Sequence, residues 1–130
     1  MNRVIWWQQF LFDTAGFLYW ATQAGWDDIR GHKDPGNGDG TLMYLGAFYG
    51  YEPNIPVASY RLIQVRDGFD DFDYLKIAEE LCGREAVMEI VTRLTTDVLK
   101  VNEDPAVMEA CRDAVAELSE SASADGQISA

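Results

Sequence analysis

The side chains best suited to binding a ligand lie near the end of an aromatic, apolar stretch over residues 16–26. Trp20 and Trp26 offer indole rings, and Gln23 offers an amide that can both donate and accept hydrogen bonds. The C–H faces of a sugar stack on aromatic rings, while its hydroxyls need fixed hydrogen-bond partners. The pattern therefore predicts a carbohydrate site, to which Tyr44 in a second apolar stretch adds another ring. The alternative is that these aromatic side chains belong to the core.

Metal and phosphate chemistry are not indicated. Residues 34–40 approach a calcium-loop pattern, but Pro35 occupies the first ligand position and Gly46 stands where a bidentate Glu is needed. The glycines of this segment lead into a strand rather than a helix, so they do not predict a phosphate cradle. His32 is the only histidine and has no second ligand or nucleophile at a suitable spacing. We predict no metal and no cofactor.

A cluster of carboxylates follows Arg66 and could suggest acid/base catalysis. Its members are Asp70, Asp71 and Asp73. The i,i+4 relation of Arg66 to Asp70 favours a simpler interpretation, an ion pair on a helix surface with the other acids facing water. The sequence therefore predicts no catalytic residue in this chain.

The overall charge excludes some classes of partner. The chain has 130 residues, enough for one domain, and 22 Asp and Glu against 10 Lys and Arg give it a net charge of −12. Such a surface repels nucleic acids and anionic membranes. Cys82 and Cys111 lack metal-ligand spacing and are predicted to be reduced, buried thiols. The sequence shows no signal-peptide or membrane-span pattern and leaves the compartment open.

The elements that must position these side chains follow from hydrophobic spacing and turn residues. Ser59 and Asp104 are predicted N-caps, Gly83 is a predicted helix stop, and Gly68 is a helix-interior weak point costing about 1 kcal/mol relative to Ala. In chain order we expect a helix over residues 2–12, a buried strand over 16–21, a loop over 27–40, a strand over 41–45, an irregular loop over 47–57, helices over 59–82, 84–101 and 105–118, and a disordered tail over 119–130.

Two buried strands alone do not close a parallel sheet, because each needs neighbours and helical cover. Either the strands pair in a small α+β unit, or the chain is the last part of a larger α/β barrel. Several segments resemble, in order and spacing, the carboxyl-terminal part of the catalytic domain of glycoside hydrolase family 123, which overlaps a large set of uncharacterised bacterial proteins. The matching segments are Arg3 with Trp7 and Gln8, residues 16–21 (Gly-Phe-Leu-Tyr-Trp-Ala) followed by Trp26, residues 38–44 (Gly-Asp-Gly-Thr-Leu-Met-Tyr), residues 56–62 (Pro-Val-Ala-Ser-Tyr-Arg-Leu) and residues 66–75 (Arg-Asp-Gly-Phe-Asp-Asp-Phe-Asp-Tyr-Leu).

This resemblance implies an α/β fold, the C-terminal fragment of a (β/α)8 barrel. Residues 1–83 would hold two late strands and the closing helix, residues 84–118 a helical hairpin, and residues 119–130 a disordered tail. It also implies a hydrolase of N-acetylgalactosaminides in which the substrate's acetamido oxygen attacks the anomeric carbon. That reaction needs a carboxylic acid for the leaving oxygen and a carboxylate to orient the amide. In the family this Asp-Glu pair lies on an earlier strand, and this chain has no such dipeptide at a strand end.

Three hypotheses remain open. In the first, the chain is the C-terminal portion of a glycoside hydrolase, inactive by itself, which binds a neutral or N-acetylated glycan through Trp20, Gln23, Trp26 and Tyr44. In the second, it is a free-standing, non-enzymatic module that binds carbohydrate or a partner chain. In the third, it is a structural remnant that orders on assembly with the missing N-terminal part of the barrel or with another copy of the chain.

Overall fold

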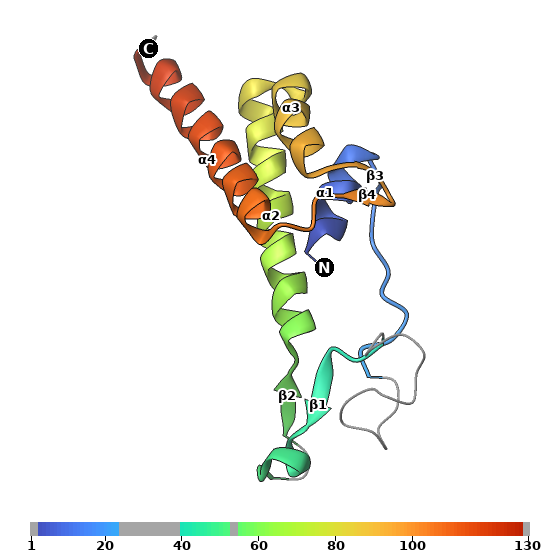
Figure 1. The fold of residues 1–130 in the computed structure, drawn as a ribbon. Helices are drawn as coiled ribbons and strands as arrows, with labels where there is room; N and C mark the ends of the chain where they lie inside the picture. The colour runs from blue at the N-terminus through green and yellow to red at the C-terminus, as the bar shows by residue number, and fades with distance from the viewer. Residues whose placement is uncertain (1–2, 24–39, 53–54, 129–130) are drawn as a thin grey trace. The chain divides into compact units, whose positions relative to one another are not determined.

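The computed structural model describes residues 3–23, 40–52 and 55–128, except the side chains of Phe48 and residues 125–128. The chain forms two compact units, each described by itself below: a helical unit of residues 1–16 and 67–130, and a β1–β2 unit of residues 17–66. The elements, labelled in Figure 1, are α1 (Val4–Leu11), β1 (Met43–Leu45), the 3-10 helix η1 (Gly46–Tyr49), β2 (Pro56–Ala58), α2 (Tyr60–Cys82), α3 (Arg84–Leu94), β3 (Thr95–Asp97), β4 (Lys100–Val101) and α4 (Pro105–Ile128).

The prediction of a (β/α)8-barrel fragment is wrong. The described part of the chain is mostly helical, and its strands form two small antiparallel pairs, β1 with β2 and β3 with β4. Residues 16–21, the expected buried strand, form no strand, and the side chains of Leu18 and Trp20 are 86% and 58% exposed. A strand buried on both faces needs a paired neighbour on each side. The isolated bridge in this part of the chain joins Gln23 to Thr41, beyond the end of the segment.

The β1–β2 unit contains a strand where the sequence predicted an irregular loop. Pro56 begins β2 opposite Leu45, a strand position at which its missing N–H is tolerated. The connection between the two strands is tight at Gly46, whose N–H donates to the Ile55 carbonyl at 2.9 Å. A Cβ on Gly46 would lie 2.4 Å from that oxygen, so the close approach requires glycine.

The predicted helix ends are confirmed where local chemistry defines them. The Ser59 hydroxyl accepts from the Leu62 N–H at 3.3 Å before α2. After α2, Gly83 adopts a φ of +83°, a conformation that favours glycine. Before α4, the Asp104 carboxylate accepts from the Ala106 N–H at 2.9 Å, and Pro105 occupies the first helical position.

The helices after Gly83 depart from their predicted lengths. Helix α3 ends at Leu94 rather than near residue 101, because the Thr95 hydroxyl donates to backbone carbonyls of Asp97 and Lys100 and supports a β3–β4 hairpin instead. The sequence predicted order to end near residue 118, whereas α4 continues to Ile128. Serine hydroxyls along this part of α4 bond to carbonyls four residues earlier, at Ser119, Ser121 and Ser123.

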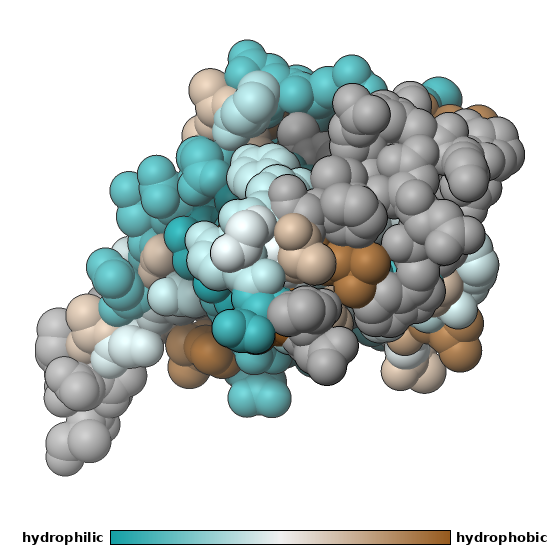
Figure 2. Space-filling model, turned by 90° about the horizontal axis from the view of Figure 1, so that it is seen from below, coloured by the Kyte–Doolittle hydropathy of each residue, from teal (hydrophilic) through white to brown (hydrophobic). Residues whose placement is uncertain are grey.

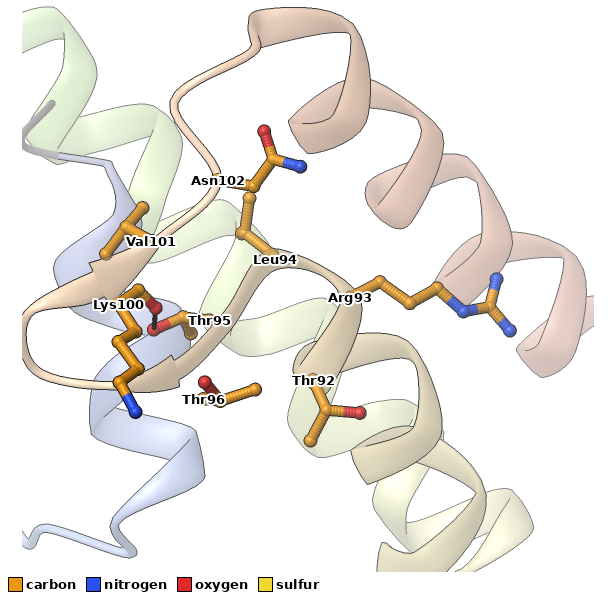
Figure 3. Close-up of a pocket in the computed structure, with 8 residues that line it drawn as sticks. All are labelled: Thr92, Arg93, Leu94, Thr95, Thr96, Lys100, Val101 and Asn102. Carbon is orange, nitrogen blue, oxygen red and sulfur yellow. Dashed lines mark hydrogen bonds between the residues drawn. The ribbon is translucent and has the colours of Figure 1, made fainter.

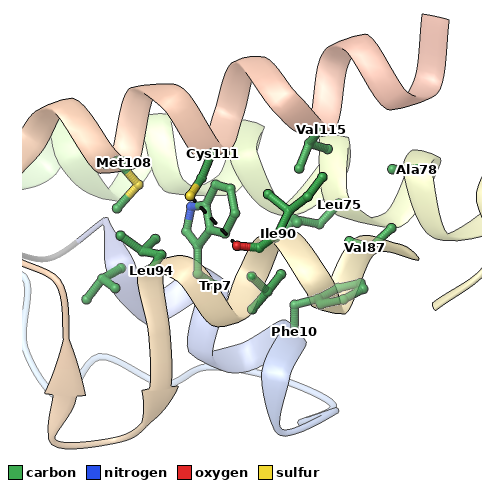
Figure 4. Close-up of a cluster of buried hydrophobic side chains, with 12 residues drawn as sticks. Trp7, Phe10, Leu75, Ala78, Val87, Ile90, Leu94, Met108, Cys111 and Val115 are labelled. Atoms are coloured by element: carbon green, nitrogen blue, oxygen red, sulfur yellow. Dashed lines mark hydrogen bonds between the residues drawn. The ribbon is translucent and has the colours of Figure 1, made fainter. Parts of the chain in front are cut away.

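The hydrophobic core of the described residues lies almost entirely in the helical unit. Figure 4 shows Trp7 of α1 between Leu94, Ile90 and Cys111, and α2 adds Leu75 and others to the same cluster. Figure 1 shows α3 and α4 running beside the part of α2 that belongs to this unit. The buried members are Val4, Trp7, Phe10, Leu75, Ala78, Val87, Ile90, Val91, Leu94, Met108, Cys111 and Val115.

The two thiols differ in burial, which predicts different reactivity. Cys111 is buried, with its sulfur 3.7 Å from the Ile90 carbonyl oxygen, whereas Cys82 is half-buried. Burial raises the pKa of the Cys111 thiol. Over a range of alkaline pH the thiol therefore stays protonated in the folded chain, although it is ionised in the unfolded chain. At pH 8 we expect a disulfide reagent to modify Cys82 first and Cys111 only as the protein opens.

The raised pKa of Cys111 also gives a pH dependence of stability. The protonated Cys111 thiol contributes fully to the free energy of unfolding below the ordinary thiol pKa of about 8.5, and this contribution declines as the pH rises above that value. Urea midpoints at pH 8 and pH 10 should therefore differ less in a Cys111→Ala variant than in the wild type. Equal labelling rates for both thiols in the folded Cys82→Ala and Cys111→Ala variants would contradict this assignment.

Candidate functional site

The predicted sugar-binding residues differ in their exposure to solvent. Trp20 is 58% exposed, while Gln23 and Tyr44 are half-buried. Trp26 lies outside the described residues. The backbone bridge from Gln23 to Thr41, with the Leu42 N–H donating to the Thr22 carbonyl at 2.8 Å, brings the Trp20–Gln23 segment beside the residues that precede β1.

Tyr44 on β1 is held by a charged partner that the sequence did not assign to it. Its hydroxyl oxygen accepts a hydrogen bond from Nη1 of Arg61, on the first turn of α2, at 3.0 Å. A phenol that accepts from a guanidinium still has its own proton to donate, so this hydroxyl is a fixed donor suited to a ligand oxygen. The Tyr44 ring also lies 6.1 Å from the Tyr49 ring between centroids, tilted by 47°.

The start of α2 is anchored to the segment that leads into β1, which positions Arg61 against Tyr44. The Ser59 N–H donates to the Leu42 carbonyl at 2.9 Å, and the Ser59 hydroxyl donates to the Thr41 carbonyl at 3.4 Å. Both Ser59 and Thr41 are buried. The tyrosine–arginine pair therefore rests on backbone bonds and does not depend on two flexible side chains alone.

The β1–β2 unit exposes much apolar surface and buries little. Among its described residues, Leu42 is the only buried hydrophobic one. We call Trp20, Tyr44, Tyr49 and Tyr51 the aromatic set; Tyr49 and Tyr51 are 50% and 59% exposed. Figure 2 shows separate brown hydrophobic patches among teal hydrophilic residues on the face seen from below; Trp and Tyr are pale on its scale, so these patches are not the aromatic set. Exposed aromatic side chains, on a unit whose described residues bury a single hydrophobic side chain, indicate a surface that a ligand or another part of the protein covers.

The carboxylate cluster of α2 contains a buried network, so the prediction that Asp71 faces water is wrong. The Asp71 side chain has no exposed surface, and Arg3 donates to both its oxygens, through Nε at 2.6 Å and Nη2 at 2.7 Å. Trp7 Nε1 donates to the same carboxylate at 3.0 Å, and Arg112 Nε lies 3.2 Å away. Arg3 also reaches Glu109 at 2.6 Å. We call these residues the Asp71 network.

The Asp71 network ties α1, α2 and α4 together within the helical unit. The hydrogen bond to Asp71 raises the pKa of Arg3 against the lowering effect of burial, and Glu109 adds to this effect. With both oxygens of Asp71 occupied by donors and closed to solvent, the carboxylate is not available as a general base. Arg3, Trp7 and Asp71 all belong to segments that carry the family resemblance. The structure thus gives these residues a packing role.

The charged side chains that line a hollow of about 320 Å³ in the helical unit do not converge on one point. It lies at the end of α3 and along the β3–β4 hairpin, and its lining includes Arg93 and Lys100. Figure 3 shows Arg93 extending toward α4 and Lys100 extending in another direction, so the two cations do not converge on one point. An anion held between them would need such convergence. We assign no anion site to this hollow.

The described residues also show no metal site and no membrane span. Within residues 3–23, 40–52 and 55–128, no three His, Cys, Asp or Glu side chains are grouped so that they could hold a metal ion. Over the same residues, every helix is too short or too polar to cross a membrane. The calcium-like segment over residues 34–39 and His32 lie outside the described residues.

Comparison with known proteins adds no family assignment. No protein-family model matches the chain, and no curated protein matches it. The resemblance to glycoside hydrolase family 123 is therefore a prediction from the sequence motifs.

Proposed function

We propose that this chain is the carboxyl-terminal portion of a glycoside hydrolase. It binds a neutral or N-acetylated glycan, of the N-acetylgalactosaminide class, through Trp20, Gln23 and Tyr44. The observation that carries the proposal is the hydroxyl of the half-buried Tyr44, held by Arg61 at 3.0 Å, with the exposed Tyr49 ring 6.1 Å from the Tyr44 ring between centroids. A sugar ring needs aromatic faces for stacking and fixed hydrogen-bond donors for its hydroxyls, and this unit offers both kinds of group.

The catalytic carboxylates come from another part of the protein. Glycoside hydrolysis generally uses a pair of carboxyl groups, and the substrate-assisted form also needs one acid and one orienting carboxylate. Among the described residues of the β1–β2 unit, Glu52 is the single carboxylate, and it is exposed. The buried Asp71 is saturated by donors from Arg3 and Trp7. The chain alone should bind glycan without hydrolysing it.

A titration of the chain with N-acetylgalactosamine and its oligosaccharides, followed by tryptophan fluorescence and calorimetry, tests this function. Trp20→Ala is expected to weaken binding by at least about fivefold, because an aromatic stacking partner contributes about 1 kcal/mol beyond its area. The matched control is Leu18→Ala, which truncates a neighbouring side chain that is 86% exposed and should leave binding unchanged.

A second pair of variants tests the hydroxyl donor. Tyr44→Phe should weaken binding, while Tyr74→Phe, which removes the hydroxyl of a partly exposed tyrosine in the helical unit, should not. Absence of glycan binding both by the chain and by a protein that contains it would refute the proposed function. Hydrolysis of a nitrophenyl N-acetylgalactosaminide by the purified chain would refute the assignment of the carboxylates elsewhere.

The alternative function is a free-standing, non-enzymatic module for carbohydrate or a partner chain. The buried core of the helical unit favours it, because such a core supports independent folding. A near-ultraviolet circular dichroism melt distinguishes the two proposed functions. Cooperative loss of signal, together with glycan affinity that no added segment improves, would favour the module. Helical signal without fixed aromatic packing would favour dependence on the rest of a larger protein.

A further inference from the structure

An apolar hairpin tip projects from the helical unit. Between β3 and β4, Leu99 is 91% exposed, the highest value among the large hydrophobic side chains of the described residues, and Val98 beside it is 61% exposed. Contact with a partner would remove this apolar surface from water, which is favourable. We call Val98 and Leu99 the hairpin tip.

Hydrogen bonds hold the backbone of the hairpin tip. Gln8 of α1 donates from Nε2 to the carbonyls of Asp97 and Val98, at 3.2 and 3.0 Å. The Leu99 N–H donates to the Asp97 carboxylate at 3.2 Å. These bonds restrict the backbone of the tip, so less conformational freedom is lost when it binds.

A groove of matching character lies on the same unit, between α3 and α4. It has a volume of about 330 Å³, and its apolar lining comes from Ala86, Ile90, Ala114 and Leu118. Glu89 and Glu117, with Arg93 and Ser121, complete the lining. The hairpin tip of the same chain is bonded to α1 through Gln8 and does not fill this groove.

Charge favours one occupant for the groove. Lys100 follows the tip directly and makes no ion pair among the described residues, in a chain with 10 Lys and Arg against 22 Asp and Glu. The groove presents two carboxylates, Glu89 and Glu117, against one cation, Arg93, and neither carboxylate makes an ion pair among the residues with known placement. We propose that the hairpin tip of one copy docks in the α3–α4 groove of a second copy, with Lys100 facing these carboxylates.

The resulting assembly is head-to-tail, because the tip and the groove are different surfaces of one chain. Two side chains in a groove bury much less than the roughly 1,000 Å² of a stable interface, so association is expected to be weak and concentration-dependent. The inference is independent of the proposed glycan binding, since it uses only residues of the helical unit.

Sedimentation velocity of the full 130-residue chain over a concentration series tests the contact. Wild type is expected to show a rising average sedimentation coefficient, and Leu99→Asp to weaken association by at least about tenfold. Trp20→Ser, which removes an exposed aromatic of the β1–β2 unit, should leave association unchanged. A wild type that stays monomeric throughout, or association that depends on Trp20 and not on Leu99, would overturn the proposal.

A charge exchange identifies the groove. Lys100→Glu and the double variant Glu89→Lys/Glu117→Lys should each lose association when alone, with unchanged circular dichroism. When they are mixed, each tip meets a groove of opposite charge, and association should return. If mixing restores nothing, the α3–α4 groove is not the binding site, and the proposal fails even if Leu99 mediates another contact.

Discussion

Replacing Asp71 with alanine is expected to destabilise the folded chain by about 3–5 kcal/mol. This is the usual cost of removing one partner from a buried ion pair, because the other charge is left buried and uncompensated. Here Arg3 would lose both of its bonds to the Asp71 carboxylate and keep the one to the exposed Glu109, which compensates a buried charge only weakly. The Trp7 indole N–H would lose its acceptor at 3.0 Å. Urea unfolding at pH 7, followed by fluorescence and circular dichroism, measures the effect.

Asp70 provides the matched control, because it precedes Asp71 on α2 and is exposed. Asp70→Ala should change stability by no more than about 0.5 kcal/mol. Joint replacement of Arg3 by Met and Asp71 by Leu should recover part of the loss, since an apolar pair avoids the cost of a lone buried charge. Equal stabilities of the Asp70→Ala and Asp71→Ala variants would show that the network contributes nothing.

Under ordinary conditions we expect the ionisation of Arg3 to add no pH dependence to the stability of the folded chain. The hydrogen bonds to Asp71 and Glu109 raise the pKa of Arg3 above its ordinary value, which is already strongly alkaline. The contribution of Arg3 to stability is therefore complete below that ordinary value and is lost only above it. A loss of stability between pH 8 and pH 10 should therefore come from groups such as the buried Cys111 thiol.

Gly68→Ala is expected to destabilise the helical unit by about 2 kcal/mol, although alanine is the better helix former by about 1 kcal/mol. The reason is the packing of α1 on α2. A Cβ at Gly68 would lie 1.7 Å from Cδ1 of Trp6, a side chain that is only 3% exposed. The indole is confined on its other contacts too, with its ring centroid 3.9 Å from that of Phe69. Relief would require the two helices to shift apart.

The control for Gly68→Ala is Gly16→Ala. A Cβ at Gly16 meets nothing within 4 Å, and its φ is not positive, so the substitution should be neutral. Trp6→Leu should reduce the cost of alanine at position 68, and a double-mutant cycle measures that coupling. A more stable Gly68→Ala protein would mean that helix propensity outweighs the contact with Trp6.

Local chemistry in the sequence determined several features of this protein. The caps at Ser59 and Asp104 and the stop at Gly83 were predictable, because their hydrogen bonds and dihedral angles involve residues a few positions apart. A helix near the N-terminus and a strand near Tyr44 were predictable from apolar spacing. The aromatic and polar composition of the candidate site could also be read directly.

Only the tertiary structure decided how distant segments meet. The sequence does not show that Arg3 reaches Asp71, 68 positions along the chain, and i,i+4 spacing instead favoured a surface pair for the cluster. Gly68 was predicted to be a weak point because propensity is local, whereas its role depends on Trp6. The antiparallel pairing of β1 with β2 and the hydrogen bond from Arg61 to Tyr44 depend on which surfaces pack against each other. An apolar pattern indicates that a surface is buried but does not identify the residues against which it packs, because hydrophobic burial is non-directional.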